Sequence, residues 1–360
     1  MSNANSVSTA AYGGAVDATA ARQIALWLFA MCALIALMLV VGGATRLTDS
    51  GLSITEWKPV TGAIPPLSEA VWLAEFEKYK TIPEYQLINF GMSLEEFKVI
   101  YWWEWAHRFL GRLIGLAFFV PMAVFILMKK TTASLSWKLF GVFLLGGLQG
   151  VMGWYMVQSG LSERVDVSQY RLAAHLSLAV ILFACVFWLA LNMTQGERRL
   201  APRGAYFLSL GFAAAVFVQM GLGALVAGLR AGKTFNTWPL MDGRFFPKGY
   251  FTNAPGFSDL FETIAAVQFN HRMGAYILTA LAIWLWFSLR RTAFAPRAKM
   301  VLAAVFAQAA LGVWTVVAAT PLSLGLLHQL GALIVFGAAL YLLHGMRPQP
   351  ALRKALSPAQ

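Results

Sequence analysis

Charged side chains are scarce in this chain of 360 residues: only 12% are Asp, Glu, Lys or Arg, whereas 59% are hydrophobic. A soluble domain carries about 25% charged residues. The scarcity is uneven, because long stretches hold no charge and short charged clusters separate them. This pattern excludes an ordinary soluble domain and is typical of a protein surrounded mostly by lipid.

Cysteine is equally scarce, with only Cys32 and Cys185, and both lie inside apolar stretches. This excludes a disulfide framework or a cysteine metal site, so we interpret both as packing residues. The net charge of +12 could indicate nucleic-acid binding. However, many basic residues lie between apolar stretches, where they set topology and contact anionic lipid. We predict a lipid membrane as partner and no nucleic acid.

Eight apolar stretches approximate the roughly 20 residues needed to cross a bilayer. They lie near residues 24–44, 109–128, 139–158, 172–193, 204–229, 273–289, 300–319 and 322–343. Lys and Arg gather after the second, fourth, sixth and eighth stretches, which predicts that these segments and both termini are cytoplasmic. The long connections 45–108 and 230–272 then lie outside. Ser93 and Glu96 form a capping-box pattern that predicts a helix running into the second span.

The last four stretches repeat features of the first four. EWAHRFLG opens the second stretch and FNHRMGAY opens the sixth, so His107–Arg108 matches His271–Arg272. Likewise His175 matches His328, and Gly150–Val151 matches Gly312–Val313. Since each copy has an even number of spans, both copies insert in the same direction.

We therefore predict an all-α integral membrane protein whose eight transmembrane helices form two tandem, parallel-repeat four-helix bundles. The predicted divisions are a disordered tail (1–23), an N-terminal bundle (24–195), a C-terminal bundle (196–346) and a cytoplasmic tail (347–360).

Four of the five histidines begin even-numbered spans and therefore lie near the outer face: His107, His175, His271 and His328. Neutral imidazole is a good axial ligand for haem iron, and bundles hold cofactors between facing helices. A hydrogen bond between helices would explain one such histidine equally well, but four at matching positions favour two haem sites. His344 has no matching partner, and we interpret it as interfacial.

Two further features bear on chemistry. Arg108 and Arg272 follow the first histidine of each pair and suit either haem propionates or lipid head groups. Glu104 lies three residues before His107, where the second copy has Gln268, and such pairs share a helix face. An ionisable group suits a pocket that carries out chemistry, so we assign the reaction to the N-terminal half. A solvated charge at the helix start explains Glu104 equally well.

These residues resemble the haem A synthase family over nearly the whole chain. The matching segments are GGATRLTDSGLSITEWKPVTGAIPP, EWAHRFLGRLIG, RLAAHLSLA, FNTWPLMDGRFFP, FNHRMGAY and LHQLGA. The resemblance implies a membrane-bound oxidoreductase that oxidises the C8 methyl group of haem O to a formyl group, giving haem A for cytochrome oxidase. It places the substrate haem between His107 and His175 and a haem b between His271 and His328, with Glu104 as the catalytic residue. We predict that Glu104 stabilises or shuttles protons as the methyl group is oxidised.

The resemblance also implies haem O synthase as a partner, with cytochrome oxidase assembly factors and a homo-oligomer left open. The expected location is a bacterial inner membrane, with the haem sites toward the periplasm. Some family members carry a cysteine pair in an outer loop; this chain has none, which leaves the electron donor open.

Two other functions fit parts of the pattern. A bis-histidine cytochrome that exchanges electrons with quinone would use the same four histidines, but it does not explain Glu104 against Gln268. A transporter built on repeats would place polar groups at the membrane midplane, whereas here they cluster at the outer boundary.

Overall fold

The computed structural model describes residues 16–162, 164–194, 198–252 and 256–349. Within these ranges, eight helices are long and apolar enough to cross a membrane. They are α1 (Ala18–Leu47), α4 (Leu94–Leu127), α5 (Ala133–Gln158), α6 (Gln169–Met193), α7 (Arg203–Gly228), α9 (Ile264–Leu289), α10 (Ala295–Val317) and α11 (Leu322–His344). The predicted all-α membrane protein with eight spans is confirmed.

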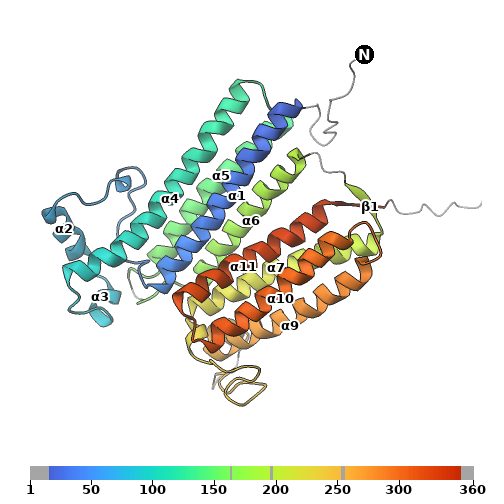
Figure 1. The fold of residues 1–360 in the computed structure, drawn as a ribbon. Coiled ribbons are helices and arrows are strands. Elements are labelled where there is room, and N and C mark those ends of the chain that lie inside the picture. The colour runs from blue at the N-terminus through green and yellow to red at the C-terminus, as the bar shows by residue number, and fades with distance from the viewer. Residues whose placement is uncertain (1–15, 163, 195–197, 253–255, 350–360) are drawn as a thin grey trace, which may run out of the picture.

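The eight helices form two neighbouring groups (Figure 1): α1, α4, α5 and α6 lie together, as do α7, α9, α10 and α11. The groups meet where α6 packs on α7 and where α11 packs on α1 and α6. The second contact includes a hydrogen bond from the Gln329 side chain to the carbonyl oxygen of Leu39, at 2.9 Å. One apolar core of buried side chains runs through both groups.

Every spanning helix ends within three residues of its predicted limit, but several begin earlier, α4 by 15 residues and α9 by nine. α1 begins at Ala18 because the Asp17 carboxylate accepts hydrogen bonds from the backbone N–H groups of Thr19 and Ala20, and the alanines that follow favour helix. The disordered tail predicted for 1–23 is therefore wrong for 18–23, and residues 1–15 lie outside the described residues. The tail predicted for 347–360 begins in β2 (Met346–Pro348), which pairs in parallel with β1 (Arg199–Ala201); residues 350–360 are likewise outside.

The long connection after α1 folds into a cap at one end of the helices. It contains η2 (Thr61–Ala63), α2 (Glu69–Tyr79) and α3 (Pro83–Leu87) (Figure 1). The predicted capping box is present, since Ser93 caps α4 and Glu96 bonds back to the Ser93 N–H. A buried aromatic cluster attaches the cap to the first turns of α4: Trp72, Phe76, Tyr79, Tyr85, Phe97 and Tyr101.

The corresponding connection after α7 is shorter. It contains η3 (Ala231–Lys233) and α8 (Asp259–Glu262) and lies at the same end of the molecule. The first residue of α1 and the last residue of α11 lie at the other end (Figure 1). Both connections therefore border the ends of the helices where the four histidines were predicted to lie.

Candidate functional site

The four predicted histidines lie on α4, α6, α9 and α11 and approach one another in pairs. The rings of His271 and His328 have centroids 6.3 Å apart and stand nearly perpendicular, at 81°. His107 and His175 are close enough to interact electrostatically. Each helix group thus contributes one pair of imidazoles.

The spacing of the second pair suits one metal ion between two rings. Imidazole nitrogens bind metals at about 2 Å, and the ring centroid lies roughly 1 Å behind the nitrogen, so two opposed ligands require a centroid separation of about 6 Å. Among the described residues, no three His, Cys, Asp or Glu side chains gather in one place to hold a bare metal ion. Two axial ligands are all that haem iron needs from a protein in such a site.

Each of the four rings packs against a glycine on a neighbouring helix. A Cβ atom at Gly42 or Gly312 would come within 2.8 Å of the ring of His107 or His328. At Gly153 and Gly223 the corresponding distances, to His175 and His271, are 3.0 and 3.1 Å. A Cβ would therefore displace the rings of His107 and His328 and crowd those of His175 and His271, so glycine gives each ring its room.

Three glutamines complete these contacts, and sequence reasoning missed them. Gln149, Gln219 and Gln308 stand four residues before Gly153, Gly223 and Gly312, one helical turn away. The side-chain nitrogen of each glutamine donates to the backbone carbonyl of the adjacent histidine and lies 3.0–3.3 Å from its Nδ1. The spacing Gln-x-x-x-Gly, repeated in three spans, is the signal that could have found them.

Glu104 is buried, with 3% of its surface exposed, so it is not the solvated charge that one interpretation allowed. One carboxylate oxygen accepts hydrogen bonds from Arg108 at 2.7 and 3.1 Å. The other accepts from the Ser53 hydroxyl at 2.8 Å and from the Ile54 N–H at 2.7 Å. Arg108 in turn donates to the carbonyl oxygens of Ile54 and Glu56. The pair therefore holds the start of the cap against α4.

Gln268 and Arg272 hold the second connection in the same way, but without an ion pair. Gln268 donates to the carbonyl oxygens of Ala231 and Phe235, and Arg272 donates to those of Phe235 and Thr237. Both arginines thus bind the long connections after α1 and α7, and their contact with propionates stays a prediction.

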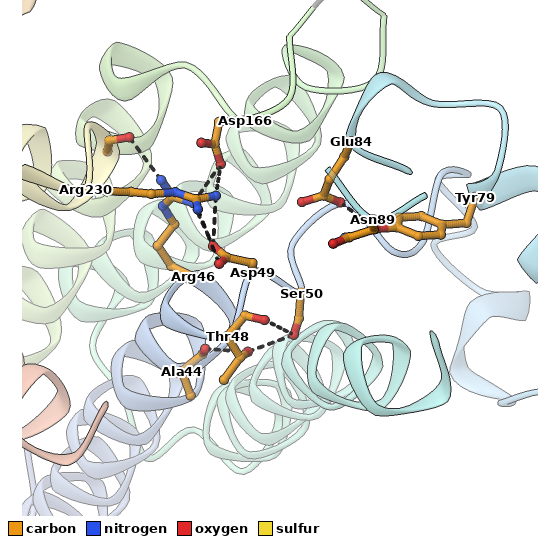
Figure 2. A network of polar contacts seen from close by, with 11 residues as sticks. Ala44, Arg46, Thr48, Asp49, Ser50, Tyr79, Glu84, Asn89, Asp166 and Arg230 are labelled. Atoms are coloured by element: carbon orange, nitrogen blue, oxygen red, sulfur yellow. Dashed lines mark hydrogen bonds and ion pairs between the residues drawn. The ribbon is translucent and has the colours of Figure 1, made fainter. Parts of the chain in front are cut away.

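An ion cluster joins the two helix groups beside the cap (Figure 2). Asp166, before α6, contacts Arg46 of α1 at 2.9 Å and Arg230 of the second connection at 2.8 Å. Arg230 also contacts Asp49 at 2.9 Å, and Arg46 donates to the carbonyl oxygen of Gly228. These contacts tie the two groups together at the end that carries the cap.

Glu84, on the cap side of Figure 2, is a buried acid. Burial, together with the negative charges of Asp166, Asp49 and Glu104, raises its pKa to about 7, although a hydrogen bond from Tyr79 opposes the shift. Asn89 donates to the Tyr79 hydroxyl at 2.7 Å and fixes its position. The cap thus holds a carboxyl group that titrates near neutral pH.

Three details of the sequence interpretation need correction. The structure pairs Gly153, not Gly150, with Gly312, because these two glycines face His175 and His328. A Cβ at Gly146, Gly147 or Gly150 would meet no described atom within 4 Å, so these glycines do not mediate close helix packing. His344 is buried rather than interfacial. Its ring packs against Trp188, and its Nε2 atom lies 3.0 Å from the side-chain oxygen of Asn192.

Comparisons of the chain with a family model and with individual proteins agree on one family. The model of the family described as cytochrome oxidase assembly protein matches residues 25–340. The chain is 52% identical to a protein named heme A synthase from Parvibaculum lavamentivorans, over 92% of this chain and 96% of the relative. Proteins of the same name from Azorhizobium caulinodans and Nitrosospira multiformis are 52% and 47% identical, over 91% of this chain and 95% and 94% of their own lengths.

Proposed function

The chain belongs to the cytochrome oxidase assembly protein family, and from that premise we propose that it is a haem A synthase. Its reaction would oxidise the C8 methyl group of haem O to a formyl group, giving haem A. In this four-electron oxidation two C–H hydrogens of the methyl group are replaced by one oxygen atom in successive steps, so the protein must hold the porphyrin in one position throughout.

The observation that carries the proposal is the pair of opposed histidines. The 6.3 Å spacing of the His271 and His328 rings matches two axial ligands on one iron, and glycines on both sides leave the rings room. These two residues would hold a haem b, which supplies one-electron redox chemistry when bound. His107 and His175 would hold the iron of the substrate haem.

Assignment of the substrate to the N-terminal half rests on two differences between the halves. Glu104 and Arg108 form an ion pair over the first pair of histidines, where the second half has neutral Gln268 beside Arg272. In addition, the apolar segments of α4 and α5 have a smaller share of buried residues than those of α9 and α10. A pocket that exchanges a lipid-soluble haem needs such access, whereas a resident cofactor does not.

Glu104 is proposed as a positioning residue. All of its hydrogen-bonding partners belong to the cap or to Arg108. We infer that it acts by holding Ser53, Ile54 and Arg108 over the substrate pocket. Its predicted role in proton transfer is the other outcome of the test described in the Discussion.

The two helix groups are proposed to be a tandem, parallel repeat with both termini in the cytoplasm. This is supported by the shared position of both ends of the helical chain and by the basic residues at that end, such as Lys129, Lys130 and Arg203. The histidines then face the periplasmic side of a bacterial inner membrane. A haem O synthase is the proposed partner, because the substrate is insoluble in water and must be passed between membrane proteins.

Haem analysis tests the function. The protein is purified from cells that make haem O, and its haems are extracted with acid and separated by chromatography. We expect haem b together with haem O or haem A. His328→Ala should lose haem b, His175→Ala should lose only the substrate haem, and His344→Ala is the control that keeps both. Haem b alone, with no haem A formed, would overturn the proposal in favour of a quinone-linked cytochrome.

A further inference from the structure

The four histidines are not held alike. Three of them lie beside a glutamine placed four residues before the glycine that their ring contacts. In α1 the residue four before Gly42 is Met38. His107 is therefore the one member of the set whose neighbouring helix offers a thioether in place of an amide.

The glutamine contacts are close and similar. Gln219 lies 3.0 Å from Nδ1 of His271 and donates to the His271 carbonyl oxygen at 2.7 Å. Gln308 makes the same two contacts with His328, at 3.0 and 2.7 Å. Gln149 contacts Nδ1 of His175 at 3.3 Å and its carbonyl oxygen at 3.1 Å. Each amide thus ties a ring and its helix to the neighbouring helix.

His107 has no such restraint. Its Nδ1 is buried and makes no hydrogen bond with any residue that the structure describes. The Met38 side chain instead contacts α4 one turn after His107, with its terminal methyl group 3.4 Å from the Cβ position of Gly111. Met38 cannot replace a glutamine there, since its sulfur is only a weak acceptor for a ring N–H and it has no N–H to donate to the His107 carbonyl oxygen.

A histidine that binds a metal through one ring nitrogen carries a hydrogen on the other and normally donates it to a partner, which fixes the ring and strengthens the ligand. Beside three of the histidines the glutamine oxygen is the available acceptor, since it has no other hydrogen-bond partner among the described residues. Loss of that partner costs roughly 10–100-fold in metal affinity. Two firmly held imidazoles leave haem iron no position for a further ligand, and such sites transfer electrons. A weaker second ligand leaves one side of the iron accessible.

We propose that His107 is the exchangeable axial ligand of the substrate haem, and that Met38 makes it so. The proposal rests on the proposed function, because it takes the four histidines to be haem ligands. His107 releases the iron on the side facing α1, while His175 keeps the haem in place. His271 and His328, each beside its glutamine, hold their haem on both sides. The same release lets the haem enter and leave the N-terminal half.

Carbon monoxide binding to the reduced protein tests this, since the gas binds ferrous haem only where a coordination position opens. In wild-type protein carrying both haems, we expect carbon monoxide to shift the visible bands of the substrate haem and not those of haem b. Met38→Gln should lower carbon monoxide affinity at the substrate haem by roughly 10–100-fold. Met38→Leu, which also lacks hydrogen-bonding capacity, is the matched control and should bind the gas as wild type does.

Gln308→Met is the reverse substitution, made beside His328 in the C-terminal half, where the test does not depend on bound substrate. It should make haem b reactive to carbon monoxide and add a high-spin component to its spectrum. Gln219→Met, on the other ligand of the same haem, serves if Gln308→Met fails to retain haem. Haem b that stays unreactive in a haem-loaded variant overturns the inference, as does unchanged carbon monoxide binding in Met38→Gln. Purified wild-type protein without any haem would instead overturn the proposed function.

Discussion

The ion pair between Glu104 and Arg108 offers a sharp test, because the second half of the chain contains a natural neutral counterpart. Glu104→Gln keeps one accepting oxygen for Ser53 and Ile54. It replaces the other oxygen by an NH₂ group that faces the guanidinium of Arg108, so two donors meet where a carboxylate now accepts two hydrogen bonds at 2.7 and 3.1 Å. Gln268 avoids this conflict because it donates to two backbone carbonyl groups.

The expected cost follows from burial. Removing one partner of a buried ion pair costs about 3–5 kcal/mol. The Arg108 side chain is 18% exposed and therefore keeps some water, so we expect about 3 kcal/mol, felt mainly as detachment of the cap. Adding Arg108→Gln should restore part of the loss, because the unpaired charge is then gone. This double-mutant cycle isolates the pair from the other contacts of each residue.

Two assays distinguish a positioning role of Glu104 from a role in proton transfer. Limited proteolysis of the connection 48–60, together with thermal unfolding, reports cap attachment, and haem extraction reports haem A formation. We expect the Glu104→Gln variant to be cleaved faster and to unfold at a lower temperature than wild type. It should retain haem b and accumulate haem O or a hydroxylated intermediate. The anchoring argument is refuted if proteolysis and unfolding match wild type. In that case, loss of haem A would assign Glu104 the proton-transfer role predicted from the sequence.

Three further predictions follow from other contacts. Gly312→Ala places a Cβ 2.8 Å from the His328 ring and should weaken haem b binding roughly tenfold or more, measured by haem content; Gly146→Ala, with no described atom within 4 Å, should leave it unchanged. Glu84 binds a proton more tightly in the folded protein, where its pKa is about 7, than at its ordinary value of 4.5. Its stabilising contribution is therefore complete below about pH 4.5 and lost as the pH rises through 7. The free energy of unfolding of the wild-type protein should fall between about pH 5 and about pH 8, and Glu84→Gln should reduce that fall by up to about 3 kcal/mol. Asp166→Asn weakens ion pairs with two arginines and should lower stability by about 2 kcal/mol, measured by thermal unfolding; an unchanged melting temperature would show that the cluster does not hold the two groups together.

The sequence predicted the helices well because their signals are local. An apolar run long enough to cross a bilayer has little choice of structure, since unpaired backbone groups are costly in lipid. The start of α4 was equally readable, because Ser93 and Glu96 satisfy each other within one turn. The start of α1 was missed because composition suggested disorder, whereas Asp17 and the alanines after it favour a helix.

Side-chain partners were less predictable. Glu104 could be singled out because it breaks the likeness between the two halves, but its partners Ser53 and Ile54 lie about fifty residues away in the chain. The match of Gly150 to Gly312 failed because several glycines occur close together in α5. Only the rotation of that helix shows that Gly153 faces His175.

By itself, the sequence determined the eight membrane-crossing helices and the placement of four histidines near one end of them, because hydrophobic length and loop charge act locally and follow chain order. The tertiary structure decided how those features combine. It brought His271 and His328 to a spacing suited to one iron, turned Glu104 inward to hold the cap, and left Nδ1 of His107 without a hydrogen-bonding partner among the described residues. These outcomes depend on how each helix is rotated and packed, which contacts between distant segments determine and local patterns do not.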